Sequence, residues 1–399
     1  MHRFARHQIL VEWPTHVLRK AQETNMPYLG LTPTLCVLAT LCLFVGGDIT
    51  NAADPIVVVT EGAIPGIRQP QAAVSNTGII VVTFGAGETI YFCKSTDRGR
   101  TYTSPTKVGQ VPKLALGMRR GPRIVAIEDL VVITAISHET GNVRAWRSID
   151  GGESWSDSVE VNNEVKSARE GLHDLAIGSD GLLFCTWLDL RNGRTQVYGA
   201  RSKDSGKTWE KNVHVYTSPS GTVCECCHPS VVIDQSGAVH VMWRNLIDGN
   251  RDMYVSTSED DGQSFSSAEK LGLDSWKLNA CPMDGGDIAT NSNGDLLTVW
   301  RHDRSVYSAG VGLMRENFLG RGEQPSIVAA SDKYFISWVD RRGGELLLLR
   351  PASTNPVSIA TRASDPVLAA SVTGGGPVVL VWESKEGDVS SIRSEIVNE

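Results

Sequence analysis

The segment SIDGGESW, residues 148–155, follows the pattern Ser-x-Asp-x-Gly-x-Ser/Thr-aromatic, and this pattern occurs in four copies. The other copies are STDRGRTY, SKDSGKTW and SEDDGQSF, at residues 95–102, 202–209 and 258–265. The pattern predicts a hairpin turn, because an aspartate accepts hydrogen bonds from nearby backbone amides and a glycine tolerates positive φ. We therefore assign a structural role, without catalysis, to the four aspartates of the pattern, Asp97, Asp150, Asp204 and Asp260.

These aspartates are 53, 54 and 56 residues apart, which indicates a fold built from copies of one structural unit. The chain also carries short apolar runs, most of them ending in Trp, that predict buried strands. The runs lie at residues 79–84, 130–136, 182–187, 238–243, 296–300, 334–338 and 378–382. An earlier strand precedes most of them and starts at Pro or Gly, as at 229–233 and 325–329. The sequence therefore predicts an all-β fold of many short strands in repeated units.

The four segments resemble the Asp-box, or BNR repeat, of sialidase-like β-propellers, and the resemblance extends over essentially all of the chain after residue 54. It implies a single propeller domain, residues 54–399, made of four-stranded blades. Seven apolar runs favour seven blades, while six blades, the number in sialidases, stay possible because the last two runs lack an Asp-box. Residues 55–60 are predicted to supply the last strand of the final blade and so to close the ring.

The first 53 residues are predicted to be an export segment. An apolar stretch of 17 residues, 31–47, precedes the small residues Asn51-Ala52-Ala53, as in a signal peptide. An uncleaved membrane anchor is the alternative, and either Met1 or Met26 serves as the start. We therefore expect a secreted or periplasmic protein without a membrane span after signal removal, in a compartment where disulfides are permitted.

Composition narrows the partners. The chain has 38 Lys+Arg against 45 Asp+Glu, a net charge of -7, and no long basic run, which disfavours nucleic acid. Hydrophobic residues make up 41% and charged residues 21%, as in ordinary globular proteins. The resemblance to sialidase-like proteins implies a carbohydrate or another small anionic ligand as partner, and we expect a monomer.

The strand order predicts that the candidate functional side chains lie on one face of the propeller. The start of each first strand and the end of each second strand lie on the same face, and the Asp-box turns lie on the other. Arginines from several units reach the first face, where guanidinium groups bind a carboxylate bidentately. The candidate substrate-binding arginines are Arg68, Arg123, Arg244, Arg301 and Arg321. The alternative for each is a solvated loop charge or an ion pair between blades.

The resemblance to sialidases implies a mechanism. The family's enzymes hold the substrate carboxylate with three arginines, use a Tyr activated by a Glu as nucleophile, and use an Asp as acid/base. Arg68 and Pro70 retain part of the family's first arginine motif, but the flanking apolar pair is lost. If the chain is an enzyme, it is expected to be a glycoside hydrolase of exo-sialidase type. The candidate catalytic residues are Asp174 or Asp284 as acid, and Glu170 or Glu323 as partner of a Tyr such as Tyr307, none of them in a family motif.

A cysteine cluster is the most specific local signal. Cys224-x-x-Cys227-His228 matches the c-type haem attachment pattern, but the extra Cys226 and the tight strand start disfavour haem. A copper or zinc site is the second interpretation, because thiolates, thioethers and imidazoles suit these metals. Its candidate ligands are Cys224, Cys226, Cys227, His228, Cys281, Met283 and His173. The third interpretation is structural, with a disulfide from the triplet to Cys281.

Segments 224–229 and 281–286 also resemble those of an exported subfamily of sialidase-like proteins. Cys93 and Cys185 fall inside apolar runs and are expected to be inert buried thiols. Two classes of function stay open. One is an enzyme that cleaves an acidic glycan, and the other is a binding module without turnover, which carries either a metal or only disulfides at the cysteine cluster.

Overall fold

The structure, a computed structural model, describes residues 55–313 and 315–398, and every regular element in these residues is a β-strand. No helix in this part of the chain is long and apolar enough to cross a membrane. The predicted export segment, residues 1–53, lies outside the described residues.

Five sheets contain four antiparallel strands each, taken in chain order. The first two sheets consist of β2 (Ile67–Val74), β3 (Ile80–Ala86), β4 (Thr89–Ser95) and β5 (Thr106–Gln110), and of β6 (Arg123–Ile127), β7 (Leu130–Ile136), β8 (Val143–Ser148) and β9 (Val159–Glu160). The next two consist of β10 (His173–Ile177), β11 (Leu183–Asp189), β12 (Gln196–Ser202) and β13 (Val213–Tyr216), and of β14 (Ser230–Ile233), β15 (Val239–Arg244), β16 (Met253–Ser258) and β17 (Glu269–Lys270). The fifth consists of β18 (Gly286–Thr290), β19 (Leu296–His302), β20 (Ser305–Gly310) and β21 (Asn317–Arg321).

The sixth sheet has seven strands because one long strand belongs to two halves. In spatial order these strands are β1 (Ile56–Thr60), β27 (Val389–Ile396), β26 (Val379–Glu386), β25 (Val357–Ala369), β24 (Gly344–Leu349), β23 (Lys333–Val339) and β22 (Glu323–Ala330). The first half of β25 pairs with β24, and from Ala363 onward β25 pairs with β26. A single strand thus ends one four-stranded group and begins the next.

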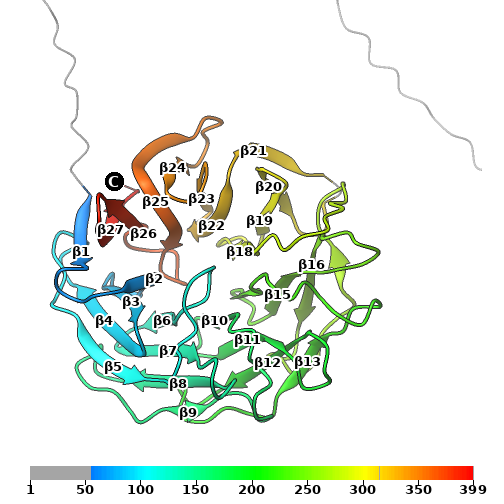
Figure 1. The fold of residues 1–399 in the computed structure, drawn as a ribbon, viewed down its shortest axis with the longest axis horizontal. Coiled ribbons are helices and arrows are strands. Elements are labelled where there is room, and N and C mark those ends of the chain that lie inside the picture. Colours follow the sequence, from blue (N-terminus) through cyan, green and yellow to red (C-terminus); the bar gives the residue numbers. More distant parts are fainter. Residues whose placement is uncertain (1–54, 314, 399) are drawn as a thin grey trace, which may run out of the picture. The chain divides into compact units, whose positions relative to one another are not determined.

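The sheets are arranged around a centre in chain order, like the blades of a propeller (Figure 1). The innermost strands of neighbouring groups contact one another in a closed cycle, β2, β6, β10, β14, β18, β22, β25 and again β2. The predicted apolar runs form the second strands, β3, β7, β11, β15, β19, β23 and β26, as the sequence indicates. The structure therefore confirms an all-β fold of antiparallel sheets that is consistent with a β-propeller.

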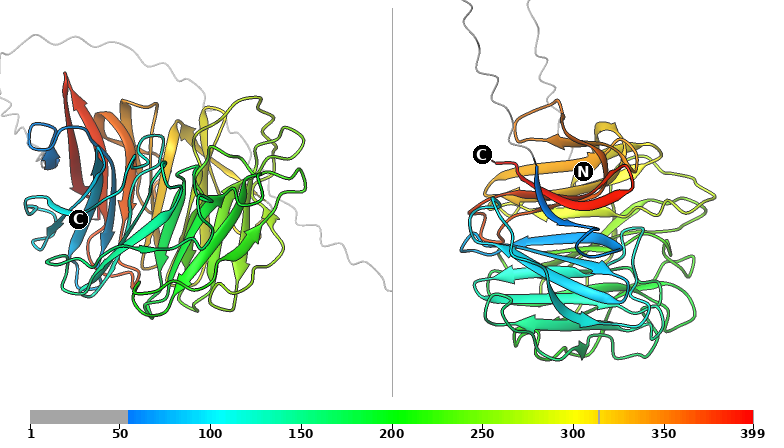
Figure 2. Two further views of the ribbon diagram at one scale, coloured as in Figure 1. Left: turned by 60° about the horizontal axis from the view of Figure 1, so that its bottom comes forward. Right: turned by 60° about the vertical axis from the view of Figure 1, so that its left-hand side comes forward.

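Strand β1 closes the ring. It pairs antiparallel with β27 through Ile56 and Ser394 and through Thr60 and Ser391, as predicted for residues 55–60. The two ends of the described chain therefore lie side by side (Figures 1 and 2). Val58 and Val59 are buried by this pairing, in the same apolar cluster as residues of β2 and β3.

Each Asp-box forms the turn between the third and fourth strands of its sheet. In the second sheet, Ser154 donates to Asp150 twice, from its backbone N–H at 2.9 Å and from its hydroxyl. The Ser148 hydroxyl donates to the same carboxylate at 2.6 Å and accepts the N–H of Gly152 at 2.8 Å. The other three boxes repeat this pattern. These bonds lower the pKa of Asp97 to about 2, with Thr101 as the main donor.

The hydrophobic core lies between neighbouring sheets. Four second strands each bury a Trp completely, namely Trp187, Trp243, Trp338 and Trp382. Val132 of β7 and Cys185 of β11 belong to one cluster, so this cluster joins two neighbouring sheets. Cys93 and Cys185 are buried free thiols, as expected, and burial raises the pKa of Cys93 to about 12.

Candidate functional site

A pocket of about 590 Å³ opens on the face where the first strands begin. We call it the mouth pocket. It lies between the start of β2 on one side and β25, β26 and β27 on the other, and the loops before β6 and after β23 complete its wall. Its polar lining includes four cations and two carboxylates, Arg68, Arg342, Arg362, Lys385, Asp365 and Glu383.

The four cations of the mouth pocket are exposed. Within the described residues, the side chains of Arg68, Arg342, Arg362 and Lys385 make no hydrogen bond or ion pair. Arg68 and Arg342 lie close enough to Glu383 for their charges to lower its pKa. These guanidinium groups therefore keep their hydrogen-bond donors for a ligand.

The two carboxylates of the pocket are less exposed than the cations, and each accepts a hydrogen bond from a neighbouring strand. Glu383 accepts the N–H of Gln69 at 2.5 Å, and the buried Asp365 accepts the Gln324 amide at 2.7 Å. The Gln324 side chain in turn accepts the N–H of Asp365 at 2.9 Å. Burial, with a further contribution from the charge of Asp365, raises the pKa of Glu383 to about 7. The Glu383 carboxyl is therefore partly protonated near neutral pH.

Two of the predicted arginines are buried instead. Arg244 donates to the backbone carbonyls of Asp284, Arg251 and Arg301 at 2.6 to 3.3 Å. Arg123 donates to carbonyls of its own loop, including that of Arg119 at 2.6 Å. Because these donors are already used, Arg123 and Arg244 hold loops in place.

Arg301 and Arg321 do not line the mouth pocket. Arg301 pairs with Glu323 at 2.8 Å and donates to the Asp303 carbonyl. The other Glu323 oxygen accepts the N–H of Arg342, so this carboxylate supports the pocket wall. Arg321 is exposed at the end of β21.

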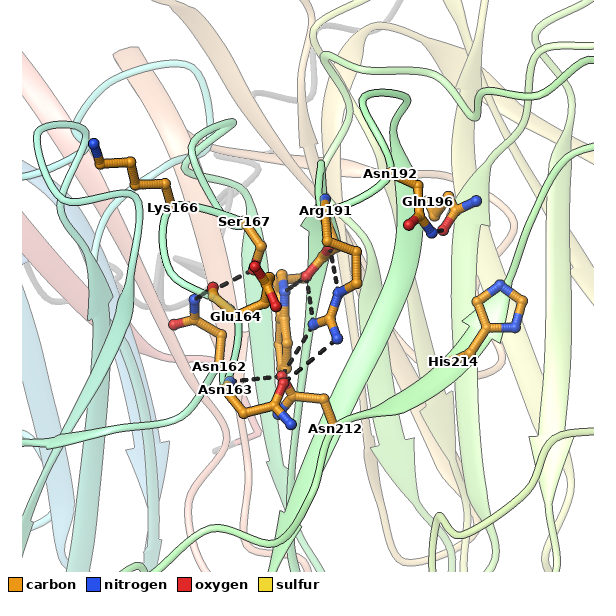
Figure 3. Close-up of polar contacts among 12 residues, drawn as sticks. Asn162, Asn163, Glu164, Lys166, Ser167, Arg191, Asn192, Gln196, Asn212 and His214 are labelled. Atoms are coloured by element: carbon orange, nitrogen blue, oxygen red, sulfur yellow. Dashed lines mark hydrogen bonds and ion pairs between the residues drawn. The ribbon is translucent and has the colours of Figure 1, made fainter.

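Arg191 illustrates how a charged loop residue becomes structural. Its guanidinium forms two bonds to the buried Asp189, at 2.8 and 2.9 Å, and lies 3.9 Å from the ring centre of Tyr198. Figure 3 shows the same guanidinium directed toward Asn163 and Asn212, whose side-chain oxygens it reaches at 3.4 and 3.0 Å. These contacts fix the loop before β10 and leave little capacity for a ligand.

The two candidate acids, Asp174 and Asp284, also connect neighbouring sheets. Asp174 on β10 accepts the N–H of Val231 on β14 at 2.9 Å, and burial raises its pKa to about 6. One oxygen of Asp284 accepts the N–H of Gln324 at 2.7 Å. The other Asp284 oxygen is buried without a hydrogen-bond partner in the described residues, and burial raises the pKa of this carboxyl.

The candidate nucleophile is not beside its candidate activators. Tyr307 on β20 packs against His302 and Phe318, each with 5.7 Å between ring centres. Within the described residues no hydrogen bond joins Tyr307 to Glu323 or Glu170. Burial raises the pKa of Glu170, which lies in the loop before β10. The structure therefore does not assemble the predicted Tyr–Glu pair.

The cysteine triplet forms a compact buried group. The sulfurs of Cys224, Cys226 and Cys227 all lie within 4.8 Å of one another, and all three side chains are buried. Cys224 Sγ is 3.4 Å from Cys227 Sγ and 3.7 Å from Cys226 Sγ, and Arg251 Nη1 approaches it at 3.1 Å. All six cysteines in the described residues are free, so the predicted disulfide to Cys281 is not seen.

The structure brings only part of the predicted metal set together. Met283 packs against the three thiols, and the exposed Cys281 interacts with Cys226. His228 instead accepts the N–H of Gly285 at 3.3 Å, and His173 contacts Thr134 at 3.1 Å. Haem attachment does not fit, because both required thiols are almost completely buried and His228 has another partner.

Several pocket residues were missed by the sequence analysis, namely Arg362, Asp365, Glu383 and Lys385. A signal existed for Glu383 and Lys385, which follow Trp382 at the end of a second strand, where functional loops were expected. No motif marks Arg362 or Asp365, because β25 carries neither an Asp-box nor a terminal Trp.

Known proteins share part of these features. Residues 130–315 match the BNR repeat-like domain. This region includes three of the four Asp-boxes and the cysteine triplet, whereas the mouth pocket is formed by residues outside it. The match supports the resemblance to sialidase-like BNR proteins. No curated protein matches the sequence.

Solved structures show the same fold at low identity. The intramolecular trans-sialidase from Ruminococcus gnavus, in complex with oseltamivir carboxylate, has 12% sequence identity and a TM-score of 0.50, over 86% of this chain and 96% of that chain. An ulvan lyase, a polysaccharide lyase bound to GlcA(1-4)Rha3S, has 11% identity and a TM-score of 0.51, over 83% of this chain and 94% of that chain. At such identities the likeness extends to the fold and not to the activity.

Proposed function

We propose that the protein is an exported, sialidase-like propeller that binds an acidic glycan in the mouth pocket. The observation that carries this proposal is the set of four exposed cations, without partners in the described residues, around one pocket of about 590 Å³. Guanidinium groups in such a set bind a carboxylate bidentately, and an exposed loop face of a rigid ring is a usual place for ligands.

The proposed ring has seven blades. Seven innermost strands contact one another in a closed cycle, which supports this count. The seven-stranded sheet then represents two blades, since β25 pairs with β24 in its first half and with β26 in its second. On this count the mouth pocket lies between the first blade and the last.

The pocket carboxylates favour hydrolysis as the reaction. A carboxylic acid with a pKa near 7 donates a proton to a leaving oxygen at neutral pH, as a glycosidase acid does. Glu383 has this pKa, and Arg68 and Arg342 lie near it. In the proposed complex the cations hold the acidic sugar and Glu383 protonates the glycosidic oxygen as its bond to the anomeric carbon breaks. A water molecule then adds to that carbon and releases a proton to solvent.

A binding module without turnover is the second candidate. It is favoured by the absence of a Tyr–Glu pair at the positions that the sialidase resemblance suggested, since Tyr307 packs against aromatic rings. In that case Glu383 and Asp365 would help to recognise sugar hydroxyl groups.

Binding and turnover of acidic glycosides test the proposal. We expect Arg68→Ala and Arg342→Ala to weaken the binding of sialyl or uronyl oligosaccharides by about tenfold or more, because each removes charge-assisted hydrogen bonds. Arg321→Ala is the matched control, since Arg321 is exposed but lies outside the pocket. Equal affinities for the pocket variants and the control would refute the assignment.

The two candidates differ in the effect of Glu383→Gln. If the protein is a hydrolase, this variant loses most of the turnover of a model acidic glycoside and retains its binding. If it is a binding module, no release of acidic sugar is detected from either protein.

A further inference from the structure

The cysteine triplet has the geometry of a metal site rather than of a disulfide. Three thiolates bound to one ion at about 2.3 Å are separated by about 3.8 to 4.0 Å in tetrahedral or trigonal arrangements. The separations of 3.4 and 3.7 Å from Cys224 Sγ, with all three sulfurs within 4.8 Å of one another, approach this spacing. A disulfide would require about 2.05 Å.

The loop is held so that the three thiols stay together. The N–H of Cys224 donates to the Arg244 carbonyl at 3.0 Å, and Arg244 is fixed by three further carbonyls. Gly285 lies against His228, with no room for a β-carbon because the His228 carbonyl would be 2.3 Å away. The loops before β14 and β18 are therefore packed closely, and this packing brings Met283 to the thiols.

The donor set points to a soft monovalent ion. The group offers three thiols and one thioether, and both histidines that sequence analysis considered are turned to other partners. Thiolate ligands suit both Cu(I) and zinc, since structural zinc sites include sets of four cysteines. A thioether is a ligand of Cu(I) and does not occur in those zinc sets, so Met283 beside the three thiols favours Cu(I). The structure thus offers sulfur only.

The positive charges beside the cluster suit a monovalent ion bound by three thiolates. Three thiolates around a monovalent ion leave two negative charges. Two guanidinium groups lie beside the cluster, Arg251 with its Nη1 at 3.1 Å from Cys224 Sγ, and Arg244 close enough for its charge to act on Cys224. Together they balance a Cu(I)–thiolate group in a buried location, where an uncompensated charge is costly.

We infer that Cys224, Cys226, Cys227 and Met283 form a Cu(I) site in this protein. It lies in the matched BNR repeat-like region, apart from the residues of the mouth pocket, and does not depend on the proposed glycan binding. The exposed Cys281, which interacts with Cys226, gives an incoming ion a first sulfur at the surface.

Copper titration of the reduced full-length protein tests the site. Under anaerobic conditions, Cu(I) is added in competition with a chromophoric Cu(I) chelator of known affinity. We expect about one Cu(I) per chain, ultraviolet absorption from thiolate-to-copper charge transfer, and an X-ray absorption spectrum with sulfur neighbours only. Nitrogen neighbours, or a site that prefers Zn(II) to Cu(I), would overturn the proposed donor set and ion.

Variants assign the copper to these residues. Cys224→Ser/Cys227→Ser is expected to lose the bound copper, and Met283→Leu to weaken it by about tenfold or more. Cys93→Ala is the matched control, because Cys93 is a buried thiol in another cluster. If the double variant does not fold, the Cu(I) affinity of Met283→Leu tests the site instead. Copper that is retained at full affinity by Met283→Leu overturns the thioether ligand, and copper lost in Cys93→Ala overturns the location.

Discussion

At the scale of single residues, the partner of a charge decides its role. Arg119 is buried, and its guanidinium donates to the carbonyls of Pro325 and Pro366 at 3.1 and 3.3 Å. Pro325 lies near the start of β22 and Pro366 lies in the second half of β25. Both are more than two hundred residues from Arg119 in sequence. Arg68, in contrast, reaches the pocket without a partner in the described residues. The same residue type is thus a structural element in the loop before β6 and a free donor at the start of β2.

Glu383 makes stability depend on pH. Its pKa rises from 4.5 to about 7 on folding, so the folded protein holds the proton more tightly than the unfolded chain. Its contribution to stability is complete below about pH 4.5 and is lost as the pH rises to about 7. In the wild type, this loss lowers the free energy of unfolding by at most about 3 kcal/mol as the pH rises. We expect the decrease to be absent in Glu383→Gln.

Urea denaturation at pH 5 and pH 8 measures this change. Glu386→Gln is the control, because Glu386 is exposed and lies on the same strand. The pKa of Glu383 would be contradicted if the free energy of unfolding fell equally between pH 5 and pH 8 in the wild type and in Glu383→Gln.

At the scale of elements, the turns of the Asp-boxes depend on one glycine each. Gly152 has φ of 88°, and a β-carbon there would lie 2.2 Å from the Phe92 ring of the preceding sheet. The Asp-box therefore sets both the turn and the distance between two neighbouring sheets. A larger residue must move a buried aromatic ring as well as strain the backbone.

We expect Gly152→Ala to lower the free energy of unfolding by about 2 to 4 kcal/mol. Gly193→Ala is the matched control, since Gly193 has φ of 74° with nothing within 4 Å of the added carbon. The control isolates the backbone strain, about 1 kcal/mol. Equal losses for the two variants, measured by chemical denaturation, would show that the contact with Phe92 is unimportant.

Strands were easier to predict than the site, for a physical reason. The second strands are largely buried, so they appear in sequence as apolar runs, most of which end in Trp, and all seven were found. The mouth pocket is assembled from the start of β2 and the end of β26, which adjoin only when the ring closes. Arg244 shows the same limit, since its carbonyl partners lie up to 57 residues away.

At the scale of the whole molecule, the first strand holds the ring closed. β1 pairs with β27 and buries Val58 and Val59, so residues from the two ends of the domain share one sheet. This pairing also keeps the wall of the mouth pocket in place, because β27 contributes Ser390 and Ser391 to it.

Removing β1 should therefore open the ring. A chain that starts at residue 62 is expected to be less stable by about 3 to 6 kcal/mol than a chain that starts at residue 55, since two buried valines and a row of backbone hydrogen bonds are lost. Thermal unfolding of both chains measures the difference, and identical unfolding temperatures would contradict the role of β1.

The central claim is that the mouth pocket recognises the negative charge of a glycan. The most direct measurement is calorimetric: the dissociation constant of a saccharide that carries a carboxylate, compared with that of its neutral counterpart. We predict a preference of about tenfold or more for the acid in the wild type, lost in Arg68→Ala/Arg342→Ala and kept in Arg321→Ala. Equal affinities of the wild type for the acidic and the neutral saccharide would contradict the claim.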